Sequence, residues 1–467
     1  MSFYRRPTPT RKFHEVVHSF AQSPGLPFHD VFAEDLISRM AEEEALNFGA
    51  GPEAIYTAAI VLWAFLTQVS SKDQSCRATV ACIMAHLVSN GKEPCSAKTG
   101  GYCKARKKLS EKFLRRLTYH VGQQVEQNAP AGWRWKDRRA LLVDGTTVSA
   151  PDTEENQAEY PQTPSQKKGL GFPMIRLVVL LTLASGVLVG SAMGPFAGKE
   201  TGETALFRTL LDQVLADDVV VADRYFCSYW MVALTKTRGA DVVFRMHQRR
   251  QYDFRRGLRL GVGDHVVEWI KPACPKWMDE DTYAAMPESL QLREVRQVVG
   301  TPGWRTQELV IVTTLTDGAR YSKDDLVDLY HDRWHAELDI RAIKVSLQMD
   351  ILRCKKPAML RKEIWAHLLV YNLTRQIMAQ AGLAADLSPR QISFTGALQT
   401  LAAFRTQLLQ ADEEELLRLT LVIHKAIATH KVGDRPGRVE PRANKRRPKE
   451  LKRMTKPRAE ARAELKK

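Results

Sequence analysis

The sequence of 467 residues has few cysteines, and none of them stands in a metal-binding or redox spacing. There are seven, an odd number, and no two are separated as CxxC. This pattern argues against a disulfide framework and against a zinc ribbon, and it favours a reducing compartment. We therefore expect a cytoplasmic protein.

The chain also lacks a hydrophobic run long enough to cross a membrane. Its longest apolar stretch, 177–190, is interrupted by Ser185 and Gly186 and falls short of the roughly 20 residues that a spanning helix needs. The opening residues, MSFYRRPTPTRKF, contain no apolar core of a signal peptide. We expect no membrane partner and predict that 177–190 forms two buried strands joined by a tight turn.

Acidic residues are scarce relative to basic ones. The chain has 53 Asp and Glu against 69 Lys and Arg, a net charge of +16. The segment 431–467 alone holds 15 basic and 5 acidic residues. It is predicted to be a disordered tail that binds nucleic acid and releases it as salt rises. The alternative is a tail that serves only solubility.

The pattern of apolar and polar residues predicts a mixed α/β protein of several domains, because the chain is too long for one compact core. Helical patterns at both ends enclose a central series of strands and helices, which a segment rich in Gly and Pro interrupts. The N-terminal helices with their basic edge suit DNA binding, although a generic helical domain has the same pattern. The predicted parts are 1–135, 136–356 with a β-rich insertion at about 247–307, the helical region 357–430, and the tail 431–467.

Two aspartates follow buried strands of the central region. Asp144 comes after the apolar triplet Leu141–Val143, and Asp223 comes after the run Val219–Ala222. In α/β sheets, ligand sites form where side chains emerge at strand ends. Each aspartate alone also fits a turn or a helix cap, so the pair matters more than either residue.

A predicted helix, 329–344, carries four more polar residues that share one face. At 100° per residue they lie at about 0°, 300°, 340° and 320°, on a stripe about 60° wide: Tyr330, Arg333, Glu337 and Lys344. A carboxylate between two cations suits a site that handles a metal ion and a phosphate. The alternative is a solvated helix with weak i,i+4 ion pairs.

Three carboxylates brought together need cations between them. Asp144, Asp223 and Glu337 offer hard oxygen ligands, which Mg²⁺ and Mn²⁺ prefer. Two such ions about 3.5–4 Å apart can activate an attacking oxygen and stabilise the leaving oxygen of a phosphodiester. The sequence therefore predicts a two-metal site.

These motifs resemble the DDE transposases of bacterial insertion sequences, the IS-four-type family with the YREK signature, to which the Tn five transposase is related. The resemblance rests on Asp144, on Asp223 in ADRYF, and on the spacing Tyr-x2-Arg-x3-Glu-x6-Lys. Four further phrases look like the family: QKKGLGFPMIRLV from Gln166, DFRRG from Asp253, VTTL from Val312 and LRCKKPAMLRKE from Leu352. The resemblance covers about 30–385.

The resemblance implies a ribonuclease-H-like catalytic core with a β-rich insertion before the Glu-bearing helix. It implies cut-and-paste transposition, in which the enzyme hydrolyses a transposon end, usually through a DNA hairpin, and joins that end to target DNA. It assigns metal binding to Asp144, Asp223 and Glu337, and contacts with the DNA backbone to Tyr330, Arg333 and Lys344.

The same resemblance implies DNA partners, namely terminal inverted repeats and target DNA, and a homodimer in the synaptic complex at the nucleoid. Related enzymes use a tryptophan of the insertion to stabilise a flipped base. Trp269, Trp277 and Trp304 are the candidates. We take Trp304 as the DNA-binding residue, although each of the three also fits a protein core.

Other functions remain open at this point. His331 and His335 resemble a zinc-protease HExxH motif, but Asp replaces the general-base Glu and the helical arithmetic turns both histidines away from Glu337. A metal-dependent nuclease of the same fold would share all three carboxylates. A catalytically inactive DNA-binding relative is the third alternative, which the presence of all three carboxylates disfavours.

Overall fold

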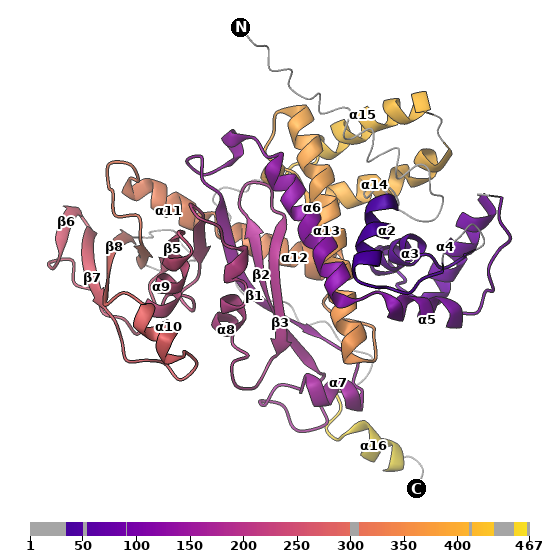
Figure 1. The fold of residues 1–467 in the computed structure, drawn as a ribbon, viewed down its shortest axis with the longest axis horizontal. Helices are drawn as coiled ribbons and strands as arrows, with labels where there is room; N and C mark the ends of the chain where they lie inside the picture. Colours follow the sequence, from indigo (N-terminus) through magenta and orange to yellow (C-terminus); the bar gives the residue numbers. More distant parts are fainter. Residues whose placement is uncertain are drawn as a thin grey trace. The chain divides into compact units, whose positions relative to one another are not determined.

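The computed structural model describes residues 34–49, 54–89, 91–298, 308–410, 413–433 and 453–464 (Figure 1). The chain divides into two compact units. One comprises the described residues of Met1–Trp133, Ala184–Val189 and Leu338–Val432, and the other those of Arg134–Leu183, Gly190–Glu337 and Gly433–Lys467. In these described ranges, no helix has the length and hydropathy that crossing a bilayer requires.

The first unit is helical. Its α-helices are α2 (Glu34–Glu43), α3 (Ala58–Ser70), α4 (Cys76–Ser89), α5 (Gly100–Lys108), α6 (Glu111–Gln127), α13 (Pro357–Ala385), α14 (Phe394–Gln410) and α15 (Glu413–Thr429). The long helix α13 packs against α3, α6 and α15. Ser110 caps the start of α6, because its hydroxyl accepts the Phe113 N–H at 2.9 Å.

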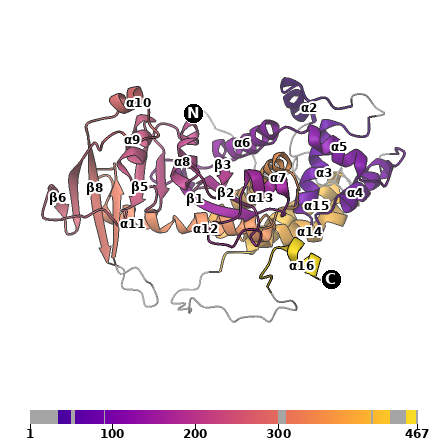
Figure 2. The ribbon, with the colours of Figure 1, turned by 90° about the horizontal axis from the view of Figure 1, so that it is seen from below.

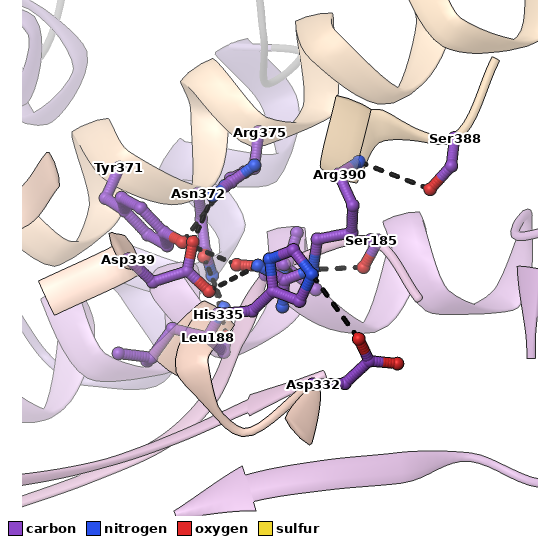
Figure 3. A network of polar contacts seen from close by, with 12 residues as sticks. Ser185, Leu188, Asp332, His335, Asp339, Tyr371, Asn372, Arg375, Ser388 and Arg390 are labelled. Carbon is purple, nitrogen blue, oxygen red and sulfur yellow. Dashed lines mark hydrogen bonds and ion pairs between the residues drawn. The ribbon is translucent and has the colours of Figure 1, made fainter. Parts of the chain in front are cut away.

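A buried polar network stabilises this helical unit (Figure 3). The fully buried carboxylate of Asp339 pairs with Arg375 and, at 2.6 Å, with Arg390. Arg375 Nε donates to the Tyr371 hydroxyl at 3.0 Å, and that hydroxyl donates to the carbonyl of Gly186 at 2.6 Å. The network therefore ties the tight turn at Gly186, whose φ is +79°, to helix α13, which explains why this turn belongs to the helical unit.

The second unit is built on one mixed sheet of nine strands in the order β3-β2-β1-β4-β5-β9-β8-β7-β6. Its first five strands are β1 (Ala140–Ser149), β2 (Met174–Thr182), β3 (Leu188–Pro195), β4 (Val219–Ala222) and β5 (Asp241–Arg245). β1 pairs antiparallel with β2 and parallel with β4, and β4 pairs parallel with β5. The predicted mixed α/β fold is confirmed.

The predicted β-rich insertion extends the same sheet. It contributes β6 (Leu258–Gly261), β7 (Asp264–Ile270) and β8 (Ser289–Val298), and the chain returns as β9 (Glu308–Thr313) between β5 and β8. Figure 2 shows β8 and β6 continuing outward beside β5. The helices of this unit are α7 (Glu154–Glu159), α8 (Glu203–Arg208), α9 (Tyr229–Thr237), α10 (Glu280–Ala285), α11 (Lys323–His331), the first part of α12 (Trp334–Arg341), and α16 (Arg458–Glu464).

The prediction of one continuous helix over 329–344 is wrong. α11 ends at His331, and α12 begins at Trp334. Between them, the N–H groups of Arg333, His335 and Ala336 bond three residues back, to Tyr330, Asp332 and Arg333. These i→i+3 bonds wind the chain more tightly than an α-helix. A π-helical turn follows at Ala342–Ser346, so a rotation of 100° per residue does not hold along the whole segment.

The range predicted as a disordered tail is described only in part. Residues 453–464 include the short helix α16, unlike the prediction, whereas most of the basic run lies outside the described residues.

Candidate active site

The two predicted aspartates lie on neighbouring parallel strands. The register pairs Val143 of β1 with Ala222 of β4. Asp144 and Asp223 directly follow this pair, and neighbouring strands are about 4.8 Å apart. Each carboxylate accepts a nearby backbone N–H: Asp144 Oδ1 from Gly145 and Asp223 Oδ1 from Tyr225, both at 2.8 Å. These local bonds fix both side chains at the same place along the sheet.

Arg333 connects this place to Glu337. One guanidinium nitrogen lies 3.3 Å from Asp144 Oδ2, and another lies 2.8 Å from Glu337 Oε1. The guanidinium carbon is also 6.0 Å from the centre of the Tyr330 ring. The turn at Asp332 and Arg333 thus places Tyr330, Arg333 and Glu337 together, although the helix that was expected to align them is interrupted.

The charges at this site are poorly compensated. Burial raises the pKa of Asp144 to about 6, and the negative charges of Asp223 and Glu337 add to this increase, whereas Arg333 and the Gly145 N–H oppose it. Burial also raises the pKa of the Tyr330 hydroxyl to about 12, so this group stays protonated at neutral pH. The site attracts further positive charge.

The donor set suits a hard divalent cation, because all three carboxylates supply oxygen ligands. As the side chains stand, however, no three Asp, Glu, His or Cys residues within the described ranges are grouped closely enough to hold one ion. The guanidinium of Arg333 instead pairs with both Asp144 and Glu337. For these carboxylates to share an ion with Asp223, Arg333 would have to release at least one of these pairings.

One residue near this site was missed from the sequence. Glu203, the first residue of α8, places its carboxylate against Gly145, so close that an added Cβ there would lie 2.3 Å from Glu203 Cδ. Burial raises the pKa of Glu203, and the charge of Asp223 adds to this. A glycine directly after Asp144 was the available sequence signal, since glycine permits close approach.

Lys344 and the two histidines of the predicted helix have different contacts. Lys344 stands in the π-helical turn of the helical unit, and its amine is 3.2 Å from Asp350 Oδ1. His335 Nε2 is 3.8 Å from Asp332 Oδ1. Among the described residues, neither His331 nor His335 belongs to a group of three His, Cys, Asp or Glu side chains that could hold a metal ion.

The three tryptophan candidates differ in their surroundings. Trp269 is 4% exposed, donates its indole N–H to Glu294 at 3.1 Å, and is covered by Arg250 at 3.4 Å from the ring centre. Trp277 instead lines a cavity of about 620 Å³, with the Arg208 guanidinium carbon 3.8 Å from its ring centre. Trp304 lies outside the described residues.

The comparisons with known proteins match this site to a family. A family model described as the transposase DDE domain matches residues 135–373, more than half of the chain. The protein belongs to this DDE transposase family. The matched range contains all six residues predicted to form the catalytic site: Asp144, Asp223, Tyr330, Arg333, Glu337 and Lys344.

Individual relatives agree with this assignment. The DDE-family chain is 27% identical to the transposase InsG for insertion sequence element IS4 of Escherichia coli (strain K12) over 296 residues, which are 62% of this chain and 64% of that one. It is 26% identical to the putative transposase InsL for insertion sequence element IS186A of the same organism, over 38% of this chain and 54% of that one. The predicted relationship to bacterial IS-four-type transposases is confirmed.

A solved structure of a piggyBac transposase synaptic complex with hairpin DNA shows a distant similarity. It aligns with a TM-score of 0.41 at 11% identity, over 87% of this chain and 85% of that one.

Proposed function

We propose that this chain is a DNA transposase that cleaves transposon ends and joins them to target DNA by cut-and-paste transposition. The observation that carries the proposal is the strand register that sets Asp144 beside Asp223, together with Arg333, which pairs with Asp144 and Glu337. The family assignment supports DNA as the substrate, in the form of terminal inverted repeats and target DNA. A homodimer in the synaptic complex, acting at the nucleoid in the cytoplasm, belongs to the same proposal.

In this proposal Asp144, Asp223 and Glu337 hold two Mg²⁺ or Mn²⁺ ions. When bound, the ions lower the pKa of an attacking water or 3′-hydroxyl and stabilise the leaving oxygen. Asp144 is held inside β1 and Asp223 directly after β4 before the substrate arrives, so little reorganisation is needed during the reaction. Glu337 approaches from the first turn of α12 and completes the set.

The neighbouring residues bind the DNA backbone. Arg333 presents a planar fork of N–H groups that matches two phosphate oxygens, and its charge is permanent. Tyr330 stays protonated and donates a hydrogen bond, because burial holds its pKa at about 12. We assign a further phosphate contact to Lys344.

A flipped base fits the cavity beside Trp277. This cavity combines an aromatic wall, which includes Tyr225, with cationic side chains from Arg208 and Arg249, and both kinds of group bind nucleotides. The burial of Trp269 argues against that residue, whereas Trp304 stays a prediction. Replacing Trp277 with Ala tests the assignment, since base flipping is required for hairpin formation and not for the first nick.

The experiment that tests the function uses purified protein, Mg²⁺ or Mn²⁺, and a duplex that carries the DNA end flanking the protein's own gene. Denaturing gels compare the wild type with Glu337→Ala and with Asp212→Ala, a control that removes an 82% exposed carboxylate of the same unit. Metal-dependent cuts at the end followed by joined products, lost only in Glu337→Ala, establish the transposase. Cutting without joining indicates a nuclease, and end binding without cutting indicates an inactive relative.

A further inference from the structure

The carboxylate of Glu203 occupies an unusual position beside the catalytic strand. Glu203 begins α8, which packs on β1 and β2. The three atoms nearest to a Cβ built on Gly145 all belong to Glu203: Cδ at 2.3 Å, Oε1 at 2.4 Å and Cγ at 2.7 Å. Any side chain after Asp144 would expel this carboxylate, so Gly145 provides the space that Glu203 occupies.

Glu203 has no structural partner that accounts for this position. Its carboxylate makes no hydrogen bond and no ion pair with any residue that the structure describes. Arg176 is the cation that lowers its pKa. Arg176 is engaged elsewhere, since its guanidinium donates to the carbonyl of Thr201 at 2.8 Å and stacks 4.6 Å from the centre of the Phe196 ring. A half-buried carboxylate without a partner lowers the stability of the folded state. Such unfavourable groups are typical of functional sites.

The charge of Glu203 also acts on the catalytic set. Asp223 raises the pKa of Glu203 by repulsion, after the effect of burial. The two carboxylates are therefore close enough to interact, and Gly145 places Glu203 one residue from Asp144. Glu203 therefore lies beside Gly145 of β1 and close enough to Asp223 for their charges to interact.

We propose that Glu203 is a fourth carboxylate ligand of the metal-binding set, next to Asp223. This inference rests on the proposed two-metal function. Two divalent ions carry four positive charges, whereas Asp144, Asp223 and Glu337 supply only three negative ones. Mg²⁺ also requires six oxygen ligands in a near-octahedral arrangement. Glu203 balances the charge and supplies one or two of these oxygens.

Direct metal binding by the full-length protein tests this role without relying on catalysis. Metal-free protein is titrated with Mn²⁺ at pH 7.5, and free Mn²⁺ is followed by electron paramagnetic resonance. The variants are Glu203→Gln, which keeps the shape and removes the charge, and Glu203→Asp, which keeps the charge. Glu200→Gln is the matched control, because Glu200 lies in the same segment, is 57% exposed and pairs with Arg208. Asp223→Asn is the positive control for loss of a ligand.

We expect Glu203→Gln to lose one of the two Mn²⁺ ions or to bind it at least about tenfold more weakly. Glu203→Asp should recover part of this affinity, and Glu200→Gln should match the wild type. Gly145→Ala should cause the same defect, since its backbone does not have positive φ and the three atoms nearest to the added Cβ all belong to Glu203. In the Glu203→Gln background, Gly145→Ala should cause no further loss.

The outcomes separate this inference from the function on which it rests. If Asp223→Asn loses Mn²⁺ while Glu203→Gln binds as many ions as the wild type with equal affinity, the role of Glu203 is overturned and the metal site stands. If the wild type binds no Mn²⁺, both proposals fail.

Discussion

Replacing Asp144 with Asn should make the metal-free protein more stable at neutral pH, although it removes a proposed catalytic group. The structure raises the pKa of this carboxyl from 3.8 to about 6, mainly through burial. A carboxyl with a raised pKa holds its proton more tightly in the folded state than in the unfolded state. Its contribution to stability is therefore fully present below pH 3.8 and is lost as the pH rises through about 6.

The expected gain in the free energy of unfolding follows from the increase in the pKa of Asp144. About two pKa units correspond to about 3 kcal/mol at 1.36 kcal/mol per unit. This value is an upper limit, because the side chain is 19% exposed and solvent screens its charge. Asn keeps an oxygen that accepts the Gly145 N–H. We expect a gain of about 1–3 kcal/mol in the free energy of unfolding at pH 7.5.

Urea unfolding of both proteins in a metal chelator, from pH 5 to pH 8, measures this gain. The difference should be largest above pH 7 and should shrink below pH 6, where the wild-type carboxyl takes up its proton. Asp212→Asn is the control, since that carboxylate is 82% exposed. A variant that is no more stable at pH 7.5, or a gain that does not depend on pH, would refute the reasoning.

Three further predictions concern other parts of the chain. Arg333→Ala should weaken strand-transfer complexes by removing a phosphate contact; equal transfer yield across a salt titration contradicts this. Truncation after His430 should lower non-specific DNA affinity and flatten its salt dependence, measured by fluorescence anisotropy, because the removed segment carries a large excess of positive charge; an unchanged slope would show that the tail does not contact DNA. Asp339→Ala should destabilise the helical unit by about 3–5 kcal/mol in urea unfolding, since it removes the buried carboxylate that pairs with both Arg375 and Arg390; a loss under 1 kcal/mol would show that water or other groups replace the carboxylate.

The sequence predicted the strands of the catalytic site because their signals are local. Asp223 directly follows β4, whereas Asp144 lies inside β1, directly after the buried run Leu141–Val143, and the strand continues to Ser149. The tight turn at Gly186 was predicted for the same reason. The side chains that these local signals identified are therefore also those that the register of the sheet brings together.

Features that depend on distant parts of the chain could not be predicted in this way. The placement of β9 between β5 and β8 is a matter of strand pairing, which a single strand's pattern does not encode. The interruption before α12 depends on i→i+3 bonds at Asp332 and Arg333, where the residue pattern continues as in a helix. Glu203 was missed because its position depends on Gly145, which is distant in the chain.

The double pairing of Arg333 has a thermodynamic consequence for the proposed function. One guanidinium pairs with Asp144 and Glu337, so it competes with the cations for these carboxylates. A DNA phosphate that takes over the guanidinium releases them. DNA ends and metal ions then increase each other's affinity by the same factor, because coupling between two binding equilibria is reciprocal. In the proposed function, a bound DNA backbone therefore tightens metal binding, and bound metal tightens the binding of the DNA end.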